Sequence, residues 1–407
     1  MKVFILGGYG KTGYPAIRLL AQSDLVTKIA IAGRNLERAK IAAADIGRKA
    51  IAVLADGTDA QQMISLTTGF DIIINAADNN AVLPCIQAAI HNGAHYCDMA
   101  WAQILQDAMQ YAPAAELAGI TAIIATGISP CITNLMGVHA GRQLDDIKQF
   151  QIGRSEIIDF SSGRELSHRQ WLANPSESAA ELLEYKPFLA WKLQMLQQNG
   201  CQQLSKYQDS EWVEINPIKN NIEVPLSHGD TASASPYFSG NDIWGTLPCD
   251  ISKEPAVELW FSPFPPQLDG MLREQALHVL DENADSDSAV NAFYKTIEKA
   301  PQRWLTLPKE YTPIAKIWVR ALGHKDGRAA QHTCWFTAPM WDVNGYFLTS
   351  VALVAAVFKI LRGDIKTRGV MLAEKAFEPQ SFFDEVVTLL PVSLPNGKLI
   401  DEAFEWL

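Results

Sequence analysis

The sequence lacks the features of several protein classes. It has no excess of basic residues, because 34 Lys and Arg stand against 45 Asp and Glu and the net charge is −11. We therefore expect no nucleic-acid partner. The six cysteines form no Cys-x-x-Cys pair. Their scatter indicates reduced thiols in a cytoplasmic protein and offers no metal-ligand spacing, so we expect no metal.

Long apolar runs are also absent. The run after Lys2 is too short for a signal peptide and leads directly into glycines. The most apolar later stretch, residues 346–360, contains Thr349, Ser350 and Lys359. It falls short of the roughly 20 apolar residues that a membrane span needs. We therefore expect a cytoplasmic protein without a membrane span, and 407 residues suggest two domains.

The N-terminal stretch carries the most informative pattern. Residues 3–6 form an apolar run typical of a strand buried on both faces of a parallel sheet. Four glycines follow, and a helical apolar stripe comes next. Strand, glycine turn and helix together are the context of a dinucleotide-binding fingerprint. The glycines permit a tight turn and bring bare backbone close to a phosphate, which the helix N-terminus then holds.

Two alternatives compete with this interpretation. Gly10-Lys11-Thr12 is similar to the end of a phosphate-binding loop of nucleotide hydrolases, but that motif needs a glycine where this chain has Ile5. The other alternative is a glycine-rich turn without any ligand. Later strand ends agree with nucleotide binding and so favour the dinucleotide fingerprint.

The end of the second expected strand, residues 28–32, bears on cofactor choice. An acidic residue at this strand end binds the ribose 2′-hydroxyl of NAD, whereas an arginine suits the 2′-phosphate of NADP. Arg34 lies 21 residues after Gly13, close to the expected spacing of about 20. We therefore expect NADP, with NAD as the alternative. A solvated surface charge is the competing interpretation of Arg34.

Strands and helices alternate over residues 1–142. After a helix at 36–46, strands are expected at 50–54, 71–75, 94–98 and 121–125, with helices at 58–67, from 82 to Gly93, at 101–118 and at 135–142. This alternation predicts an α/β fold, a Rossmann-type doubly wound parallel sheet with its ligand at the carboxyl ends of the strands. The residues expected to contact the cofactor are Gly7, Gly8, Tyr9, Gly10, Lys11, Thr12, Gly13, Arg34, Asn35, Asp56, Asn75, Ala76 and Ala77.

The pattern changes after residue 142. Strands are expected at 147–154, 257–261, 314–322 and 331–337, and a Lys-Asp-Gly hairpin joins the last two. Residues 143–345 are therefore predicted to form a second, α+β domain on a largely antiparallel sheet, which carries substrate contacts and a homodimer contact. Within residues 346–377, the helix 346–361 is expected to pack back on the first domain. Residues 378–407 are expected to form a C-terminal tail.

Several motifs follow one another in a characteristic order: Gly7-x-x-Gly10-x-x-Gly13, Ala32-Gly33-Arg34-Asn35, Ile74-Asn75-Ala76-Ala77, Gly93–Asp98, Gly127–Leu135, the Lys325-Asp326-Gly327 hairpin, the helix around Thr349, Gly369-Val370 and Phe382-Phe383. Together they resemble the saccharopine dehydrogenase/reductase-like NAD(P)-binding oxidoreductases. The resemblance covers the first domain well, the C-terminal part acceptably and residues 155–310 hardly at all.

The resemblance implies a nicotinamide-dependent oxidoreductase that acts on the C–N bond of an amino-acid-derived secondary amine or imine. Substrate carboxylates would need a cationic partner, for which Arg154 is the candidate, with a surface charge as the alternative. Proton transfer would need a group that titrates near neutral pH. Asp98, Tyr96 and His332 are the catalytic candidates. Asp98 comes first, because an acid at this strand end, near the nicotinamide, would be placed to bind an iminium. A helix-capping Asp98 is the competing interpretation.

Two other functions remain open. The first is carbonyl or enoyl reduction of a less polar substrate, in keeping with the tryptophans spread from Trp171 to Trp304. The Tyr-x-x-x-Lys dyad of short-chain reductases is not found, because Tyr311 and Lys316 are five residues apart. The second is a sensor or scaffold that binds NADP without turnover.

Overall fold

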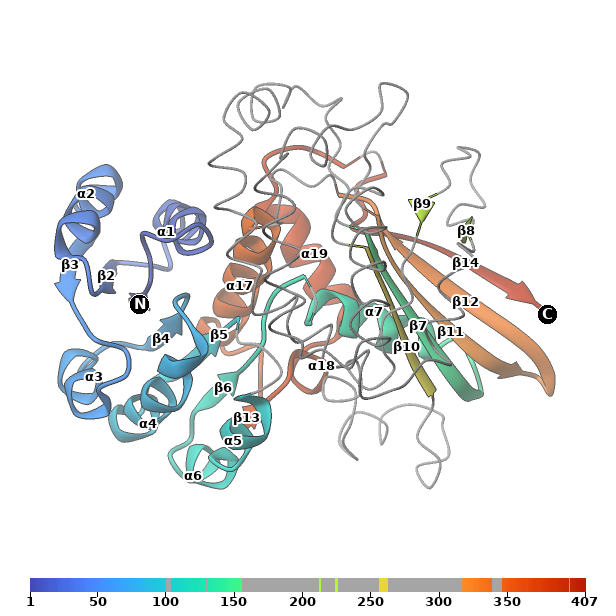
Figure 1. Cartoon of the computed structure of the whole chain (residues 1–407), viewed down its shortest axis with the longest axis horizontal. Coiled ribbons are helices and arrows are strands. Elements are labelled where there is room, and N and C mark those ends of the chain that lie inside the picture. Colours follow the sequence, from blue (N-terminus) through green and yellow to red (C-terminus); the bar gives the residue numbers. More distant parts are fainter. Residues whose placement is uncertain are drawn as a thin grey trace, which may run out of the picture.

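The computed structural model describes residues 1–99, 104–128, 130–155, 212–213, 224–225, 256–262, 316–338, 346–394 and 396–407. Within these residues the chain forms two main sheets, with helices around the first and against the second (Figure 1). A third, two-stranded pairing joins β8 (Trp212–Val213) to β9 (Val224–Pro225). Ser129 of the Gly127–Leu135 motif lies outside the described residues, as does most of the predicted second domain.

The first sheet has seven parallel strands in the order β13-β6-β5-β4-β1-β2-β3. Leu6 pairs with Ala32 on one side and with Asn75 on the other. The carboxyl ends of these strands therefore meet at one edge. The strands are β1 (Lys2–Leu6), β2 (Lys28–Gly33), β3 (Ala50–Leu54), β4 (Ile72–Asn75), β5 (His95–Asp98), β6 (Thr121–Ile123) and β13 (Gly369–Met371).

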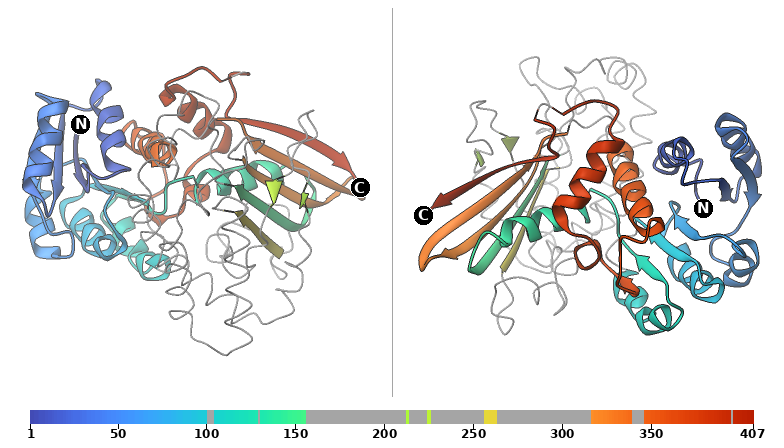
Figure 2. Two further views of the ribbon diagram at one scale, coloured as in Figure 1. Left: turned by 45° about the horizontal axis from the view of Figure 1, so that its top comes forward. Right: turned by 180° about the vertical axis from the view of Figure 1, so that it is seen from behind.

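Helices cover both faces of this sheet. On one face α1 packs beside α2 and α17, and on the other α3, α4, α5 and α6 lie together (Figures 1 and 2). Strand order reverses between β1 and β4, which is the switch point where open α/β sheets bind ligands. The helices are α1 (Gly13–Gln22), α2 (Leu36–Ile46), α3 (Ala60–Leu66), the 3₁₀ turn η1 (Asn79–Ala81), α4 (Val82–Asn92), α5 (Leu105–Met109), α6 (Ala112–Leu117) and α17 (Tyr346–Leu361).

Two helix predictions need correction. The single helix expected at 101–118 is wrong, because two short helices, α5 and α6, occupy its described part. Pro113 lies in the first turn of the second of them, and its missing N–H and its ring prevent a continuous helix. The helix expected at 135–142 begins earlier, as α7 (Ile132–Gly141).

The second sheet has the order β10-β7-β11-β12-β14. All neighbours are antiparallel except β10 and β7. The predicted hairpin is confirmed: Asp326 and Gly327 both have positive φ, as a two-residue turn between twisted strands requires. The C-terminal residues supply its edge strand. The elements are β7 (Asp146–Ser155), β10 (Ala256–Ser262), β11 (Lys316–Lys325), β12 (Arg328–Phe336), α18 (Ala373–Ala376), α19 (Pro379–Leu389) and β14 (Ile400–Trp406).

Helix α17 is the central packing element of the C-terminal half. Thirteen of its sixteen residues are buried, so it is a core helix rather than an amphipathic surface helix. It packs against α1 and α19. Its Ser350 hydroxyl lies 2.6 Å from the Thr12 carbonyl oxygen, to which it donates a hydrogen bond. Segments from the two ends of the chain are therefore joined beside the glycine loop.

The fold class expected from the sequence is confirmed: a Rossmann-type parallel sheet is combined with a second, largely antiparallel one. Among the described residues, no helix is both long and apolar enough to cross a membrane.

Candidate cofactor site

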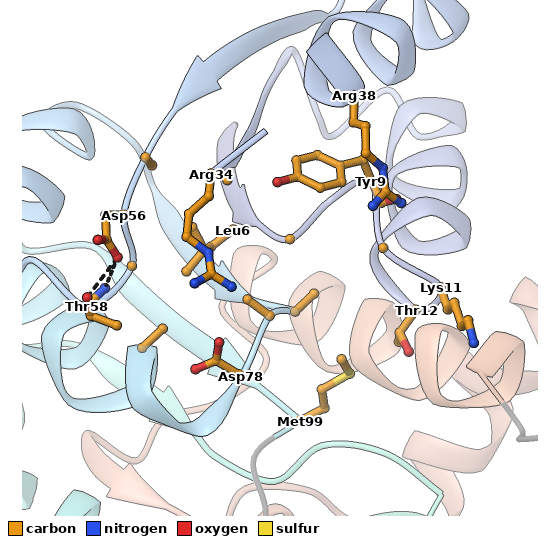
Figure 3. Close-up of a pocket in the computed structure, with 18 of the residues that line it drawn as sticks. Leu6, Tyr9, Lys11, Thr12, Arg34, Arg38, Asp56, Thr58, Asp78 and Met99 are labelled. Carbon is orange, nitrogen blue, oxygen red and sulfur yellow. Dashed lines mark hydrogen bonds between the residues drawn. The ribbon is translucent and has the colours of Figure 1, made fainter. Parts of the chain in front are cut away.

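A cavity of about 470 Å³ opens at the carboxyl ends of β1, β2 and β4 (Figure 3). It has the size of a small-molecule site and lies at the switch point of the sheet. The residues that line it are Leu6, Gly7, Tyr9, Gly10, Lys11, Thr12, Gly33, Arg34, Arg38, Ala55, Asp56, Gly57, Thr58, Ala76, Ala77, Asp78, Ala81, Met99 and Tyr346.

Close backbone contacts explain the glycines of the loop. Gly7 has a φ of +78°, and a Cβ there would lie 2.5 Å from the Ala76 carbonyl oxygen. A Cβ on Gly13 would lie 2.1 Å from the Gly7 carbonyl oxygen. The first turn of α1 thus rests directly on the backbone of the loop. Its N-cap residue, Thr12, makes no side-chain cap hydrogen bond, and no acidic residue occupies the first turn. This helix end is suited to an anion.

Two arginines mark the end of the cavity near β2. The Arg34 side chain extends into the cavity from the strand end (Figure 3). Arg38, from the first turn of α2, lies with its guanidinium 5.0 Å from the centre of the Tyr9 ring and donates to the Tyr9 carbonyl oxygen at 3.3 Å. Tyr9 itself accepts from the Asn35 N–H at 3.0 Å. The guanidinium groups give this end positive charge suited to a phosphate.

Asp56 also lines the cavity near Arg34 (Figure 3). Its carboxylate accepts from the Thr58 N–H at 3.0 Å and from the Thr58 hydroxyl at 2.8 Å. These hydrogen bonds, with a smaller contribution from Arg34, hold the pKa of Asp56 below its usual value. The group is therefore ionised at neutral pH and partly offsets the positive charge of Arg34.

The wall formed by β4 is made of small residues. The Asn75 side chain accepts from the Ala77 N–H at 3.0 Å and donates to the Asp78 carbonyl oxygen at 2.9 Å. This local turn presents Ala76 and Ala77 to the cavity. At the remaining side lie Met99 and Tyr346, and the Lys11 ammonium lies 5.4 Å from the centre of the Tyr346 ring.

Four of the residues predicted to contact the cofactor are not among those that line the cavity. Each of them stabilises the local structure around it instead. Gly8 and Gly13 allow close packing around the loop. Asn35 caps α2, as its position before the helix suggested, by accepting from the Arg38 N–H at 3.0 Å. Asn75 shapes the β4 turn. They support the site without lining it.

Sequence reasoning missed other lining residues. Arg38 follows Arg34 by one helical turn, so the start of α2 could have indicated it. Met99 directly follows the predicted strand that ends at Asp98. Tyr346 comes from the distant α17, and local pattern carries no signal for it.

Asp98 and Tyr96, two of the catalytic candidates, form a buried pair. The Tyr96 hydroxyl donates to one Asp98 carboxylate oxygen at 2.7 Å, and the Ala125 N–H donates to the other at 2.7 Å. Ala125 has a φ of +60°, which is unusual for a residue with a side chain. Asp98 thus stabilises a strained turn after β6. Burial raises the pKa of Tyr96 well above its usual value. Neither residue is among those that line the cavity, so these contacts favour positioning over catalysis.

The other two predicted site residues lie in the second sheet. Arg154 is in β7, where it pairs with Ile317 and Phe261. His332 is in β12, 4% exposed, with its Nε2 3.3 Å from a Glu402 carboxylate oxygen. Burial lowers the pKa of His332. The structure does not place either residue among those that line the described cavity.

A buried carboxyl group that sequence reasoning missed lies in α18. The Asn134 amide donates to Glu374 Oε1 at 2.8 Å, while Oε2 has no hydrogen-bond partner among the described residues. Burial raises the pKa of Glu374 to about 7. Asn134 belongs to α7, whose preceding loop reaches the first turn of α17: a Cβ on Gly127 would lie 3.3 Å from Thr349 Cγ2. Glu374 is not among the residues that line the cavity.

Comparison with known proteins supports the interpretation of this cavity. Residues 3–123 match the family described as the saccharopine dehydrogenase NADP binding domain. This match bears out the expected resemblance to that family over the N-terminal domain. A match to this NADP-binding domain implies an NAD(P) cofactor. The residues present fit one, since side chains in place of the glycines would fill the loop.

Solved structures extend the likeness to the whole chain. Apo saccharopine dehydrogenase (L-Glu forming) from Saccharomyces cerevisiae is 14% identical with a TM-score of 0.63, and the match covers 99% of each chain. At that identity the match shows a shared fold. A dTDP-glucose 4,6-dehydratase from Streptomyces venezuelae is 18% identical over 26% of this chain and 41% of its own (TM-score 0.23). Serine dehydrogenase from Escherichia coli is 12% identical, and the match covers 30% of this chain and 81% of that enzyme (TM-score 0.27). Neither of these partial matches bears on function.

The contact between α1 and the loop yields a prediction. Gly13→Ala forces a Cβ against the Gly7 carbonyl oxygen, whereas Gly10→Ala brings one only to 3.1 Å of the same atom. We expect Gly13→Ala to lower the free energy of unfolding by about 1–3 kcal/mol and Gly10→Ala by clearly less. Urea unfolding measures both. Equal losses in the two variants would contradict the close approach.

Proposed function

We propose that the protein is an NADP-dependent oxidoreductase that transfers a hydride at the C–N bond of an amino-acid-derived secondary amine or imine. The observation that carries the proposal is the cavity, which the glycine loop, the uncapped N-terminus of α1 and two arginines line together. It lies in a domain that matches the saccharopine dehydrogenase NADP binding domain. The whole-chain fold shared with the yeast enzyme supports the substrate class.

In this proposal the chain's own residues divide the work of binding. The loop from Gly7 to Thr12 and the N-terminus of α1 hold the pyrophosphate. Arg34 and Arg38 bind the 2′-phosphate, because a guanidinium forms paired, charge-assisted hydrogen bonds with phosphate oxygens. Arg38 is already held over the Tyr9 ring, so little side-chain entropy is lost when it binds.

A bound nicotinamide coenzyme would supply or accept the hydride. The protein then has to orient the substrate and move a proton at nitrogen. Arg154, in the second sheet, is proposed to bind a substrate carboxylate. Asp98 and Tyr96 are proposed to position the turn after β6, which Asp98 holds by accepting a hydrogen bond from the Ala125 N–H.

Cofactor choice can be tested with single variants. Each of Arg34→Ala and Arg38→Ala removes a charge-assisted contact of about 1.5–3 kcal/mol, so we expect the NADPH dissociation constant to rise about 10-fold to 100-fold. NADH binding lacks that contact and should change by about threefold or less. Calorimetric titration measures both cofactors. Arg48→Ala, on an exposed turn after α2, is the control and should bind as wild type. Equal weakening of NADPH and NADH binding would refute the assignment.

The reaction class can be tested by turnover. We expect NADPH oxidation when the protein is incubated with NADPH and 2-oxoacids together with amino acids or amines. The absorbance of the reduced nicotinamide measures it. Simple ketones, aldehydes and enoyl thioesters alone should give no comparable rate. Preferred turnover of those carbonyl or enoyl compounds would replace the proposal with the reductase alternative. Cofactor binding without turnover in any panel would favour a sensor or scaffold.

We also propose a homodimer that forms through the second sheet. Edge strand β14 carries Phe404 and Trp406, which are 39% and 44% exposed. Edge strands with exposed apolar side chains favour pairing with another chain. Light scattering should give twice the chain mass of 44.8 kDa. Trp406→Lys should shift the protein towards monomer. A stable wild-type monomer at micromolar concentration would defeat the proposal.

A further inference from the structure

A cluster of metal-ligating side chains lies in the second half of the molecule, among residues for which the cofactor site gives no role. His139, Cys334 and Glu402 each place a ligand atom within 4.8 Å of the other two. They come from α7, β12 and β14, which are far apart in the sequence. No metal was expected from the sequence, since it has no Cys-x-x-Cys pair. These three residues are far apart in the sequence and come together only in the fold.

Sheet geometry explains why these side chains meet. Cys334 and Glu402 are direct cross-strand partners in the antiparallel pair β12–β14, so their side chains emerge on the same face. His332 lies two residues before Cys334 and shares that face. Helix α7 packs on this sheet (Figure 2). Its residue His139 contacts Glu402.

The contacts within the cluster resemble those of a ligand set with an outer support. His139 Nε2 lies 2.8 Å from Glu402 Oε2. His332 Nε2 lies 3.3 Å from the same oxygen, and its other ring nitrogen is 4.0 Å from Cys334 Sγ. His332 also has a hydrogen bond with the Ala140 backbone. A histidine held in this way orients a ligating carboxylate, as outer-sphere partners do in metal sites.

We propose that His139, Cys334 and Glu402 bind a divalent zinc-type ion, with His332 as the positioning residue for Glu402. Imidazole, thiolate and carboxylate are the ligands that zinc takes in proteins. Zinc bonds of about 2.0–2.3 Å hold ligand atoms roughly 3.3–3.8 Å apart in a tetrahedron, so the present separations need only small side-chain shifts. The fourth position belongs to water.

Surroundings of the cluster favour a cation. His139 lies in the last turn of α7, at the negative end of the helix dipole. The Glu402 side chain is 44% exposed and the His139 side chain 17% exposed, so an ion can enter from solvent, while Cys334 is buried behind them. A bound ion would tie the C-terminal strand to β12 and to α7, the helix that begins at the strained loop after β6.

Zinc titration of the chelator-treated full chain, purified without a metal-affinity tag, tests the proposal. We expect about one zinc ion per chain by elemental analysis and a melting temperature that rises on adding zinc. Glu402→Gln keeps the shape of a half-exposed residue and should weaken zinc binding about 100-fold. His332→Gln should weaken it about 10-fold, because it removes only the outer support.

Cobalt substitution supplies a readout that only direct ligation affects. Cobalt-loaded wild-type protein should show a thiolate-to-metal charge-transfer band, and Cys334→Ser should lose it while still binding NADPH. Cys85→Ser, a buried thiol in α4, is the matched control and should keep the band. The proposal is overturned if wild type binds zinc no more tightly than Glu402→Gln, or if the band is absent or survives in Cys334→Ser.

Discussion

The approach of α1 to the loop after β1 is the constraint on which the site depends. Gly13 lies so close to the Gly7 carbonyl oxygen that an added Cβ would be only 2.1 Å from it. That contact fixes the direction of α1, and its N-terminal dipole therefore faces the cavity rather than the sheet. Gly7, held at positive φ against the Ala76 backbone, closes the other side of the same turn.

The C-terminal half is built onto that turn. Ser350 of the buried helix α17 donates to the Thr12 carbonyl, and Tyr346 at the start of the same helix lines the cavity. From α17 the chain continues through β13, which extends the first sheet, to β14, which ends the second. The two sheets are thus connected by covalent chain and by packing of α7, α17 and α19. Residues after 346 therefore belong as much to the cofactor region as to the second sheet.

Local patterns in the sequence predicted local structure well. The strand at 50–54, the helix at 36–46 with its Asn35 cap and the Asp326-Gly327 hairpin all follow from periodicity, capping and turn chemistry. Those same rules could not find Tyr346 in the cavity wall, because it arrives through tertiary packing. They placed Asp98 at a strand end correctly but could not show that its carboxylate is occupied by Tyr96 and Ala125. His332 was singled out for its chemistry alone, and its neighbours Glu402 and His139 come from other elements.

The proposed function requires that this cavity hold a 2′-phosphorylated dinucleotide. Calorimetric titration of the unmodified wild-type protein with NADPH and with NADH tests that claim most directly. A site with a glycine cradle for the pyrophosphate and Arg34 and Arg38 for the 2′-phosphate predicts micromolar binding of NADPH and binding of NADH weaker by about tenfold or more. Absence of heat with both cofactors at millimolar concentration, or tighter binding of NADH, would contradict it.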